Sequence, residues 1–185
     1  MERLIVSLAG NPASGKTDVA KHLEDAYGFT TVRPSGLIRA YAENRGIPLR
    51  ERRDYSQTFN DMIAEEGSDK IVEQMLDSTD GNLCVDGERL PQHIMRLRKH
   101  GAVVIALWCP IQTRYERAME RADERDKVTF EEFKADEASE YQSTEPPGIS
   151  TLTVMQMADY HLDGSKEPRV VQAAVEDIVE LHLAA

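Results

Sequence analysis

The chain has 185 residues, of which 41% are hydrophobic and 30% are charged, and its formal net charge at pH 7 is −11. These values are typical of a single globular core, and no apolar run approaches the length of a membrane span, so an integral membrane protein is excluded. The acidic charge also argues against broad nucleic-acid binding, which depends on clustered cations.

The two cysteines, Cys84 and Cys109, both fall in segments that are predicted to be buried strands. We interpret them as small core residues rather than as a disulfide or a metal pair. The apolar run Leu4–Ala9 is too short for a signal peptide. These features favour a cytoplasmic protein, and because no repeat or linker divides the chain, we expect one domain over residues 1–185.

The strongest motif lies between a predicted strand, Leu4–Ala9, and a predicted helix that ends near Gly28. The strand is apolar, and Val19 and Leu23 give the helix one apolar face. The residues between them follow the pattern G-x-x-x-x-G-K-[ST], which in this context is typical of a phosphate-binding loop. We therefore predict a nucleotide phosphate site made of Gly10, Asn11, Pro12, Ala13, Ser14, Gly15, Lys16 and Thr17.

This loop suits phosphate for physical reasons. Its backbone N–H groups can surround an anion, and the helix N-terminus adds the positive end of its dipole. Lys16 can reach the terminal phosphates of a nucleotide, and the Thr17 hydroxyl can ligate Mg²⁺. ATP and Mg²⁺ are therefore the expected cofactors, with Lys16 as a catalytic residue.

Helices dominate the next part of the chain. A short β-rich segment, Phe29–Arg33, predicts the second strand, and Pro34-Ser35-Gly36 turns the chain into a helix over Leu37–Asn44. The pattern is mostly helical from Arg50 to Asp77, with a break at Gly67-Ser68.

Two further strands are predicted at Asn82–Asp86 and Ala102–Cys109, on either side of a helix over Leu90–Lys99. The later strand is the most apolar run in the chain, which favours a parallel strand covered on both faces. Asp86 ends the earlier one, where a carboxylate can accept hydrogen bonds from Mg²⁺-bound water. The alternative is that Asp86 only caps a turn with Gly87. Beside a phosphate loop we favour the metal role.

The last third of the chain is predicted to be mainly helical. A helix over Ile111–Ala122 is rich in arginine, and Asp123–Val128 is almost wholly charged. Thr129 and Glu132 form a capping-box pattern that starts another helix. A short strand at Asp159–Leu162 precedes a terminal helix.

Strands that alternate with helices predict an α/β protein with a parallel sheet and right-handed crossovers. Ligands of such sheets bind at the carboxyl ends of the strands. The phosphate loop and the segments Arg33–Gly36, Asp86–Arg89 and Cys109-Pro110 all lie at those ends. We therefore expect them to form one site.

Two arginines follow predicted strand ends, Arg39 and Arg89. A guanidinium binds phosphate bidentately and keeps its charge, so the pair could hold a second phosphorylated ligand facing the phosphate loop. The alternative is that both are solvated surface residues.

A second arginine group comprises Arg114, Arg117, Arg121 and Arg125. The last three recur every four residues and share one helical face, where they could neutralise charge on a transferring phosphoryl group. Interleaved glutamates make a salt-bridged, solvated helix a serious alternative. We select Arg121 and Arg125 because they enter the charged 123–128 stretch, the natural place for a lid.

The order of these motifs resembles the nucleoside monophosphate kinase group of P-loop proteins over nearly the whole chain. The similarity rests on the phosphate loop, Ser35–Arg39, Asp86–Arg89 and the region from Arg117 to Arg125, and Ala158–Asp163 resembles the family's last strand. Within the group, the chain is most similar to small adenylate-kinase-like, dephospho-CoA-kinase-like and cytidylate-kinase-like proteins. Dephospho-CoA kinases usually carry an acid after the second strand, where this chain has Arg33.

The resemblance implies a three-layer P-loop NTPase fold, with a five-stranded parallel sheet of order 2-3-1-4-5 and helices on both faces. It also implies an acceptor-binding helical region over residues 36–77 and a short lid over residues 122–128. The acceptor would be bound by Ser35, Gly36, Arg39 and Arg89. The donor phosphates would meet two catalytic arginines, Arg121 and Arg125.

The function that the sequence favours is transfer of the ATP γ-phosphoryl group to a small phosphorylated acceptor, most simply a nucleoside monophosphate, by a monomer or homodimer. A second hypothesis is a dephospho-CoA kinase or another small-metabolite kinase. A third is an ATP-binding switch or assembly factor that hydrolyses ATP slowly. The pair Arg39 and Arg89 favours a second phosphate ligand over a pure switch.

Overall fold

The computed structural model describes residues 3–50, 52–121, 129–141 and 148–184. The strands are β1 (Ile5–Ala9), β2 (Thr30–Val32), β3 (Leu83–Asp86), β4 (Val103–Trp108) and β5 (Tyr160–Asp163). The helices are α1 (Lys16–Tyr27), α2 (Pro34–Arg45), α3 (Arg52–Glu66), α4 (Ser68–Leu76), α5 (Pro91–Lys99), α6 (Ile111–Glu120), α7 (Phe130–Tyr141), α8 (Thr151–Gln156) and α9 (Pro168–Leu183).

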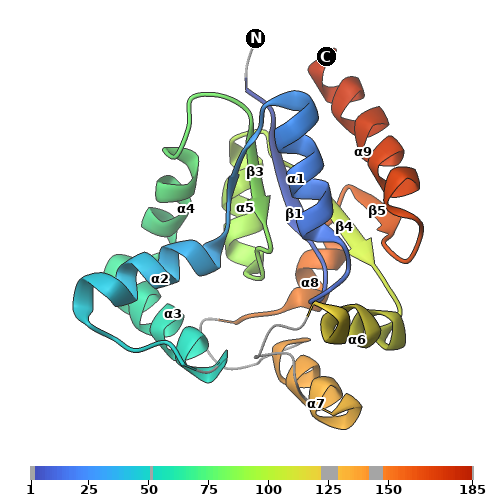
Figure 1. The fold of residues 1–185 in the computed structure, drawn as a ribbon. Coiled ribbons are helices and arrows are strands. Elements are labelled where there is room, and N and C mark those ends of the chain that lie inside the picture. The colour runs from blue at the N-terminus through green and yellow to red at the C-terminus, as the bar shows by residue number, and fades with distance from the viewer. Residues whose placement is uncertain (1–2, 51, 122–128, 142–147, 185) are drawn as a thin grey trace.

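The five strands form one parallel sheet in the order β2-β3-β1-β4-β5, with helices on both faces (Figure 1). This order confirms the predicted fold class. The register also aligns the strand ends that carry the motifs. Val32 pairs with Val85, and Leu8 pairs with Asp86, so the residues that follow β2, β3 and β1 emerge together at the carboxyl edge.

One face of the sheet is covered by α1 and α9. Strand residues alternate between faces, and Val6 of β1 and Ile105 of β4 both point to this side. They pack with Leu23 of α1 and Val175 of α9 in a buried cluster. Cys84 lies in the same cluster, and burial raises the pKa of its thiol, in agreement with its expected role as a core residue.

The other face is covered by α4, α5 and α8. Ile5 and Val104 point to this side and pack against Met75 of α4, Ile94 of α5 and Val154 of α8. Side chains of this size stabilise the fold by about 1.5–3 kcal/mol each when fully buried. The two clusters hold the central strands rigidly, and the site is built on the edge of that rigid layer.

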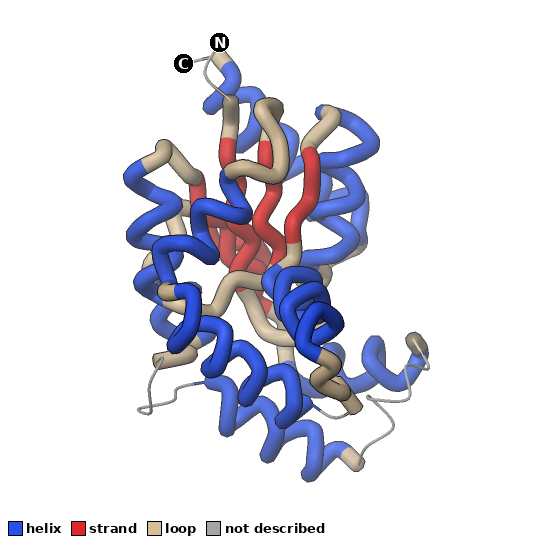
Figure 2. The backbone as a smooth tube through the Cα atoms, turned by 90° about the vertical axis from the view of Figure 1, so that its left-hand side faces the viewer, coloured by secondary structure: helices blue, strands red, loops and turns tan. Residues whose placement is uncertain are grey.

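Two helical arms extend beyond the carboxyl edge of the sheet (Figures 1 and 2). One arm is formed by α2 and α3, which largely coincide with the first part of the predicted acceptor-binding region, and the other by α6 and α7. The start of α7 has the predicted capping box, since Glu132 accepts from the Thr129 backbone N–H at 2.7 Å and donates its own N–H to the Thr129 hydroxyl at 3.3 Å. The arms flank the region into which the phosphate loop opens.

Besides shifts of one to three residues at the ends of several elements, two differences from the expected elements stand out. The arginine-rich helix was expected to reach Ala122, but α6 ends at Glu120 with Arg121 as its C-cap. Helix α8 was not predicted, because six residues carry too little periodicity to be distinguished from loop. The Ser150 hydroxyl caps it by accepting from the Thr153 N–H at 3.1 Å, and buried Val154 anchors it to the core.

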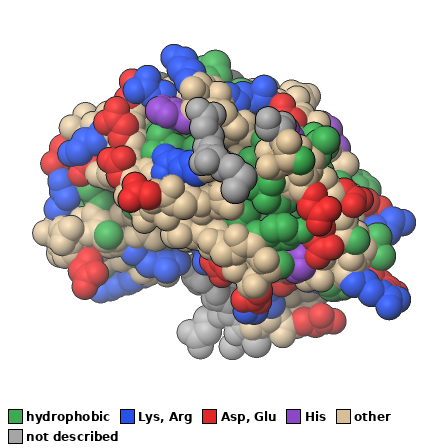
Figure 3. All heavy atoms as spheres, turned by 90° about the horizontal axis from the view of Figure 1, so that it is seen from above, with side chains coloured by type: hydrophobic (Ala, Val, Ile, Leu, Met, Phe, Trp, Pro, Cys, Tyr) green, Lys and Arg blue, Asp and Glu red, His purple; other side chains and the backbone are tan. Residues whose placement is uncertain are grey.

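The helices that the structure describes include none that is both long and apolar enough to cross a lipid bilayer. The end of the molecule opposite the arms carries acidic and basic side chains interspersed over its surface (Figure 3).

Candidate functional site

The phosphate loop joins the carboxyl end of β1 to α1 through a tightly packed backbone path. Gly10 has φ 141°, and a Cβ there would lie 2.5 Å from the Leu107 carbonyl oxygen of β4, so the position requires glycine. Ala13 adopts φ 60°, a left-handed conformation in which alanine carries a cost of about 1–2 kcal/mol. A left-handed residue within such a loop helps to turn neighbouring backbone N–H groups toward one side, as an anion site requires.

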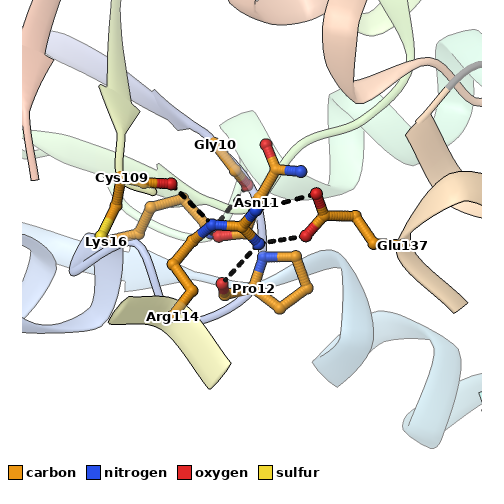
Figure 4. A network of polar contacts seen from close by, with 7 residues as sticks. All are labelled: Gly10, Asn11, Pro12, Lys16, Cys109, Arg114 and Glu137. Carbon is orange, nitrogen blue, oxygen red and sulfur yellow. Dashed lines mark hydrogen bonds and ion pairs between the residues drawn. The ribbon is translucent and has the colours of Figure 1, made fainter. Parts of the chain in front are cut away.

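Lys16 is held within its own loop. Its Nζ donates to the carbonyl oxygens of Gly10 and Asn11, at 2.8 Å each (Figure 4). Burial lowers the pKa of the Lys16 ammonium to about 8, the Asp86 carboxylate opposes that shift, and nearby arginines add to it. The positive charge is therefore poorly compensated, which favours an anionic ligand beside it.

A second observation indicates that the loop suits a phosphate group. The Ser14 hydroxyl is fully buried and has no hydrogen-bond partner among the described residues. An unsatisfied buried polar atom costs about 1–3 kcal/mol. Phosphate oxygens beside the loop could accept from such groups, so the geometry supports the predicted nucleotide phosphate site.

A cavity of about 410 Å³ opens on one side of the loop, which we call the α9-side cavity. Its floor is the loop and the start of α1, and its outer wall includes Pro168, Val171 and Gln172 of α9. Gly164, after β5, also lines this cavity. The mixture of apolar wall and loop N–H groups suits a nucleotide with its phosphates on the loop.

A second cavity of about 670 Å³, the α3-side cavity, opens on the other side of the loop. Tyr55, Ser56 and Phe59 of α3 form one wall, and Ile38 of α2 adds an apolar surface. The cationic residues that line it are Lys16, Arg33, Arg39, Arg89 and Arg121, and the acidic residues are Asp86 and Glu88. In a chain of net charge −11, this excess of cations is a local feature that favours an anionic ligand.

The two cavities meet on the phosphate loop. Lys16 and Thr17 line both of them, as do Ala13 and Arg121. Two ligands, one in each cavity, would therefore be brought together at Lys16 and Thr17. Such an arrangement would bring the two ligands into proximity, which is the main requirement of a transfer between bound ligands.

Asp86 lies at the end of β3, as the sequence indicated, and its carboxylate is 5% exposed. Its Oδ2 accepts a hydrogen bond from Arg33 Nε at 2.9 Å. With Thr17 it is positioned beside the loop, and these two residues could hold Mg²⁺ through the hydroxyl and through bound water. The ion pair with Arg33 was not predicted.

Arg89 belongs to a turn that is fixed by a buried acid. Glu88 Oε1 accepts from the N–H groups of Arg89 and Leu90 at 2.8 Å each, and its Oε2 pairs with His93 Nδ1 at 2.9 Å. The other ring nitrogen of His93 lies 2.6 Å from the Ser68 hydroxyl. Glu88 and His93 are almost fully buried, so this network holds the Arg89 backbone against the start of α4.

The other predicted acceptor residues lie at the start of α2. Ser35 lines the α3-side cavity, and so does Arg39, whose guanidinium lies 6.0 Å from the centre of the Tyr55 ring. Gly36 is in the same first turn, but it is not among the residues that line the cavity. Its N–H donates to the Arg33 carbonyl at 2.8 Å, which is a helix-forming contact.

Two arginines of the predicted phosphate-facing group, Arg114 and Arg117, form hydrogen bonds with the protein framework. Arg114 is buried, donates to the Cys109 carbonyl at 2.8 Å and to Pro12 at 3.5 Å, and forms a two-point ion pair with Glu137 of α7 (Figure 4). Arg117 donates to the Gly164 carbonyl at 2.7 Å. Arg114 thus uses its donors on backbone carbonyls and Glu137, whereas Arg117 also lines the α9-side cavity.

Arg121 is the member of that group which the structure places at both cavities. It stays a candidate for contact with transferring phosphates. Arg125 and the predicted lid over residues 122–128 lie outside the described residues.

The sequence interpretation placed the segments Arg33–Gly36 and Asp86–Arg89 at the site but gave Arg33 and Glu88 no role, and it did not select His93 or Glu137. A signal existed for Arg33, since it and Asp86 each end a predicted strand, and neighbouring parallel strands place their ends side by side. The Glu88–His93 spacing of five residues and the remote Glu137 gave no comparable signal.

Comparisons with known proteins show which proteins this chain is similar to. A family model described as an AAA domain matches residues 6–142. A UPF0200 protein of Hyperthermus butylicus is 30% identical over 172 residues, which cover 86% of this chain and 84% of the relative. A cytidylate kinase of Methanocella arvoryzae is 28% identical over 168 residues, covering 88% of this chain and 89% of the kinase.

A UPF0200/UPF0201 protein of Archaeoglobus fulgidus is 26% identical over 189 residues. The match covers 97% of this chain and 54% of that protein, so the chain spans about half the length of this relative.

Solved structures show the same fold at low identity. TT1252 from Thermus thermophilus has a TM-score of 0.66 and 17% identity, covering 98% of this chain and 99% of that one. Shikimate kinase from Aquifex aeolicus has a TM-score of 0.55 and 12% identity, with the same coverage. The chain therefore belongs to the AAA-domain family of P-loop kinases.

Proposed function

We propose that this protein transfers the γ-phosphoryl group of ATP to a nucleoside monophosphate. The observation that carries the proposal is the meeting of two cavities on one phosphate loop, with Arg39 and Arg89 lining the second cavity. A nucleotide hydrolase needs one ligand cavity, whereas a kinase needs two that converge. The relative from Methanocella arvoryzae that is named a cytidylate kinase supports a monophosphate acceptor.

In this proposal, ATP lies in the α9-side cavity with its β- and γ-phosphates on the loop. Lys16 Nζ leaves the carbonyls of Gly10 and Asn11 and binds the terminal phosphates. The Thr17 hydroxyl and Asp86 would hold Mg²⁺, which would neutralise phosphate charge. Arg121 contacts the phosphates from the junction of the cavities.

The acceptor lies in the α3-side cavity with its phosphate toward the loop. Arg39 and Arg89 bind the phosphate, and Ser35 donates a further hydrogen bond. The rings of Tyr55 and Phe59 provide an apolar wall for a base. An oxygen of the acceptor phosphate attacks the γ-phosphorus, the bond to the β–γ bridging oxygen breaks, and ADP leaves. Positioning and charge stabilisation supply the catalysis, so the step needs no general base.

The direct test is a screen of phosphoryl acceptors with γ-labelled ATP and Mg²⁺. The set contains CMP, UMP, AMP and GMP, together with dephospho-CoA and shikimate. Transfer to a nucleoside monophosphate, lost in a folded Lys16→Ala variant, supports the proposal. Transfer only to dephospho-CoA or another metabolite, or release of inorganic phosphate with no acceptor labelled, would replace it with one of the two alternative hypotheses.

Kinetics of acceptor-site variants refine the assignment. Arg39→Ala and Arg89→Ala should each raise the acceptor KM or lower kcat while ATP affinity stays nearly intact, because the residues line only the α3-side cavity. Arg169→Ala is the matched control, since this exposed arginine lies outside both cavities. A fall in ATP affinity without a change in acceptor kinetics would reverse the roles of the two cavities.

A further inference from the structure

We propose that Arg33 is a third acceptor-phosphate ligand, which Asp86 holds in position for binding. The inference rests on the proposed function and names a residue that the acceptor motifs do not contain. Its starting point is the register of the sheet. Val32 of β2 pairs with Val85 of β3, so the next residues along the two strands, Arg33 and Asp86, lie side by side at the carboxyl edge.

The backbone of Arg33 is held from both directions. It continues β2 in an extended conformation, with φ −116° and ψ 127°, and it is the N-cap of α2. Its carbonyl accepts from the N–H groups of Gly36 at 2.8 Å and of Leu37 at 3.4 Å. The side chain therefore leaves from a rigid position on the wall of the α3-side cavity, which it lines together with Arg39 and Arg89.

The guanidinium is anchored through one nitrogen. Arg33 Nε donates to Asp86 Oδ2 at 2.9 Å, and the Nη groups have no further partner among the described residues. The side chain is 43% exposed, while the Asp86 carboxylate is 5% exposed. A buried carboxylate thus fixes the orientation of a guanidinium whose remaining edge can still form a two-point contact with phosphate, at a reduced entropic cost.

The local charges favour an anion at that edge. Both oxygens of Glu88 are already occupied, by the N–H groups of Arg89 and Leu90 and by His93. Asp86 accepts from Arg33 itself. The two acids of the cavity are therefore compensated within the protein, and an entering phosphate meets a surface dominated by cations.

The simpler explanation is that Arg33 only neutralises the buried Asp86. The two explanations predict different results when lysine replaces Arg33. Lysine can preserve an ion pair with Asp86, but its ammonium is a point charge and cannot bind Asp86 on one edge and phosphate on another as a planar fork does. Acceptor affinity in Arg33→Lys and Arg33→Gln variants therefore separates a phosphate ligand from a counter-ion.

The experiment is calorimetric titration of CMP, UMP, AMP and GMP into the wild type, Arg33→Gln, Arg33→Lys and the control Arg169→Gln. Thermal melting establishes that each variant is folded, and titration of a non-hydrolysable ATP analogue with Mg²⁺ reports on the other cavity. Loss of charge-assisted contacts predicts monophosphate binding about 10- to 100-fold weaker in Arg33→Gln. Arg33→Lys should bind with intermediate affinity, the control should match the wild type, and the ATP analogue should bind all four proteins alike.

Wild-type monophosphate affinity in folded Arg33→Gln, or full rescue by Arg33→Lys, would overturn the inference and leave Arg33 as a counter-ion of Asp86. If the wild type binds none of the four monophosphates, the proposed function falls and this inference falls with it. The wild-type titration thus separates failure of the function from failure of the Arg33 assignment.

Discussion

Lys16 occupies two chemical environments in the proposed reaction. In the free protein its ammonium lies against two loop carbonyls, and burial lowers its pKa to about 8 from an ordinary value of 10.5. Bound phosphates would stabilise the ammonium form and raise that pKa again. Nucleotide binding should therefore take up a proton over the pH range in which free Lys16 is partly neutral.

At pH 8, the free protein carries about half a proton on Lys16, so binding of an ATP analogue with Mg²⁺ should take up about half a proton per site. Calorimetry in buffers of different ionisation enthalpy measures this uptake. At pH 6.5 Lys16 is already charged, and its contribution should be close to zero. Equal uptake at the two pH values would show that Lys16 does not bind the phosphates as described.

Gly164 packs so closely against neighbouring backbone that there is no room for a side chain. A Cβ at this position would lie 2.2 Å from the Ser14 carbonyl oxygen and 3.2 Å from that of Trp108. Both are backbone atoms in rigid segments, so they cannot move away without deforming the phosphate loop.

Gly164→Ala should therefore lower the free energy of unfolding by about 1–3 kcal/mol and weaken nucleotide binding. Thermal melting and titration of an ATP analogue measure the two effects. Gly81→Ala is the control, because the nearest atom to its Cβ is a side-chain hydroxyl at 3.5 Å. Wild-type affinity in the Gly164 variant would mean that the loop tolerates the displacement.

At the scale of elements, one buried arginine, Arg114, contacts both the phosphate loop and α7. The Arg114 side chain of α6 donates through Nε to the Cys109 carbonyl and through Nη1 to the Pro12 carbonyl (Figure 4). Its Nη2 donates to Glu137 of α7 at 2.8 Å. The rings of Phe130 and Phe133 pack edge-to-face on Tyr115 of α6 beside it. The α6–α7 arm is thus coupled to the loop through a charge that cannot be left unpaired without cost.

Glu137→Gln should lower the free energy of unfolding by about 1–3 kcal/mol, since Arg114 would keep its carbonyl contacts but lose its counter-charge. For a chain of this size, each kcal/mol corresponds to about 2–4 °C in Tm. Glu131→Gln, in the same helix but 80% exposed, should change Tm little. Equal melting temperatures for the two variants would show that the pair contributes no stability.

Across the whole molecule, charge is distributed unevenly. The net charge is −11, and the end opposite the arms mixes both signs (Figure 3), yet the α3-side cavity is lined by five cationic residues and two compensated acids.

The two cavities share Lys16 and Thr17, so one ligand could occupy both. Such a ligand makes the contacts of both cavities but loses its translational freedom only once on binding.

A compound in which adenosine and cytidine are joined through five phosphates should therefore raise Tm more than ATP analogue and CMP together at equal concentrations. Differential scanning calorimetry with and without each ligand measures the shifts. Diadenosine triphosphate, with a shorter bridge, is the control for nucleotide binding to one cavity. No additional shift from the five-phosphate compound would contradict a shared, continuous site.

The sequence by itself determined the features that depend on local pattern. The phosphate loop, the start of α7 at its capping box, and the buried β4 each follow from residues that lie close together in the chain. The parallel sheet and the placement of Asp86 at its carboxyl edge also follow, because alternating strands and helices permit few topologies. The strand order came from the family resemblance, and the structure confirms it.

Only the tertiary structure decided which contacts each of several identical side chains makes. Arg114, Arg117 and Arg121 come from one arginine-rich segment, yet the first two bind carbonyls and Glu137, while the third reaches both cavities. The pairs Arg33–Asp86 and Arg114–Glu137 span 53 and 23 residues. Helical periodicity states which residues share a face, but which partner a charge meets is decided by packing between elements far apart in the chain.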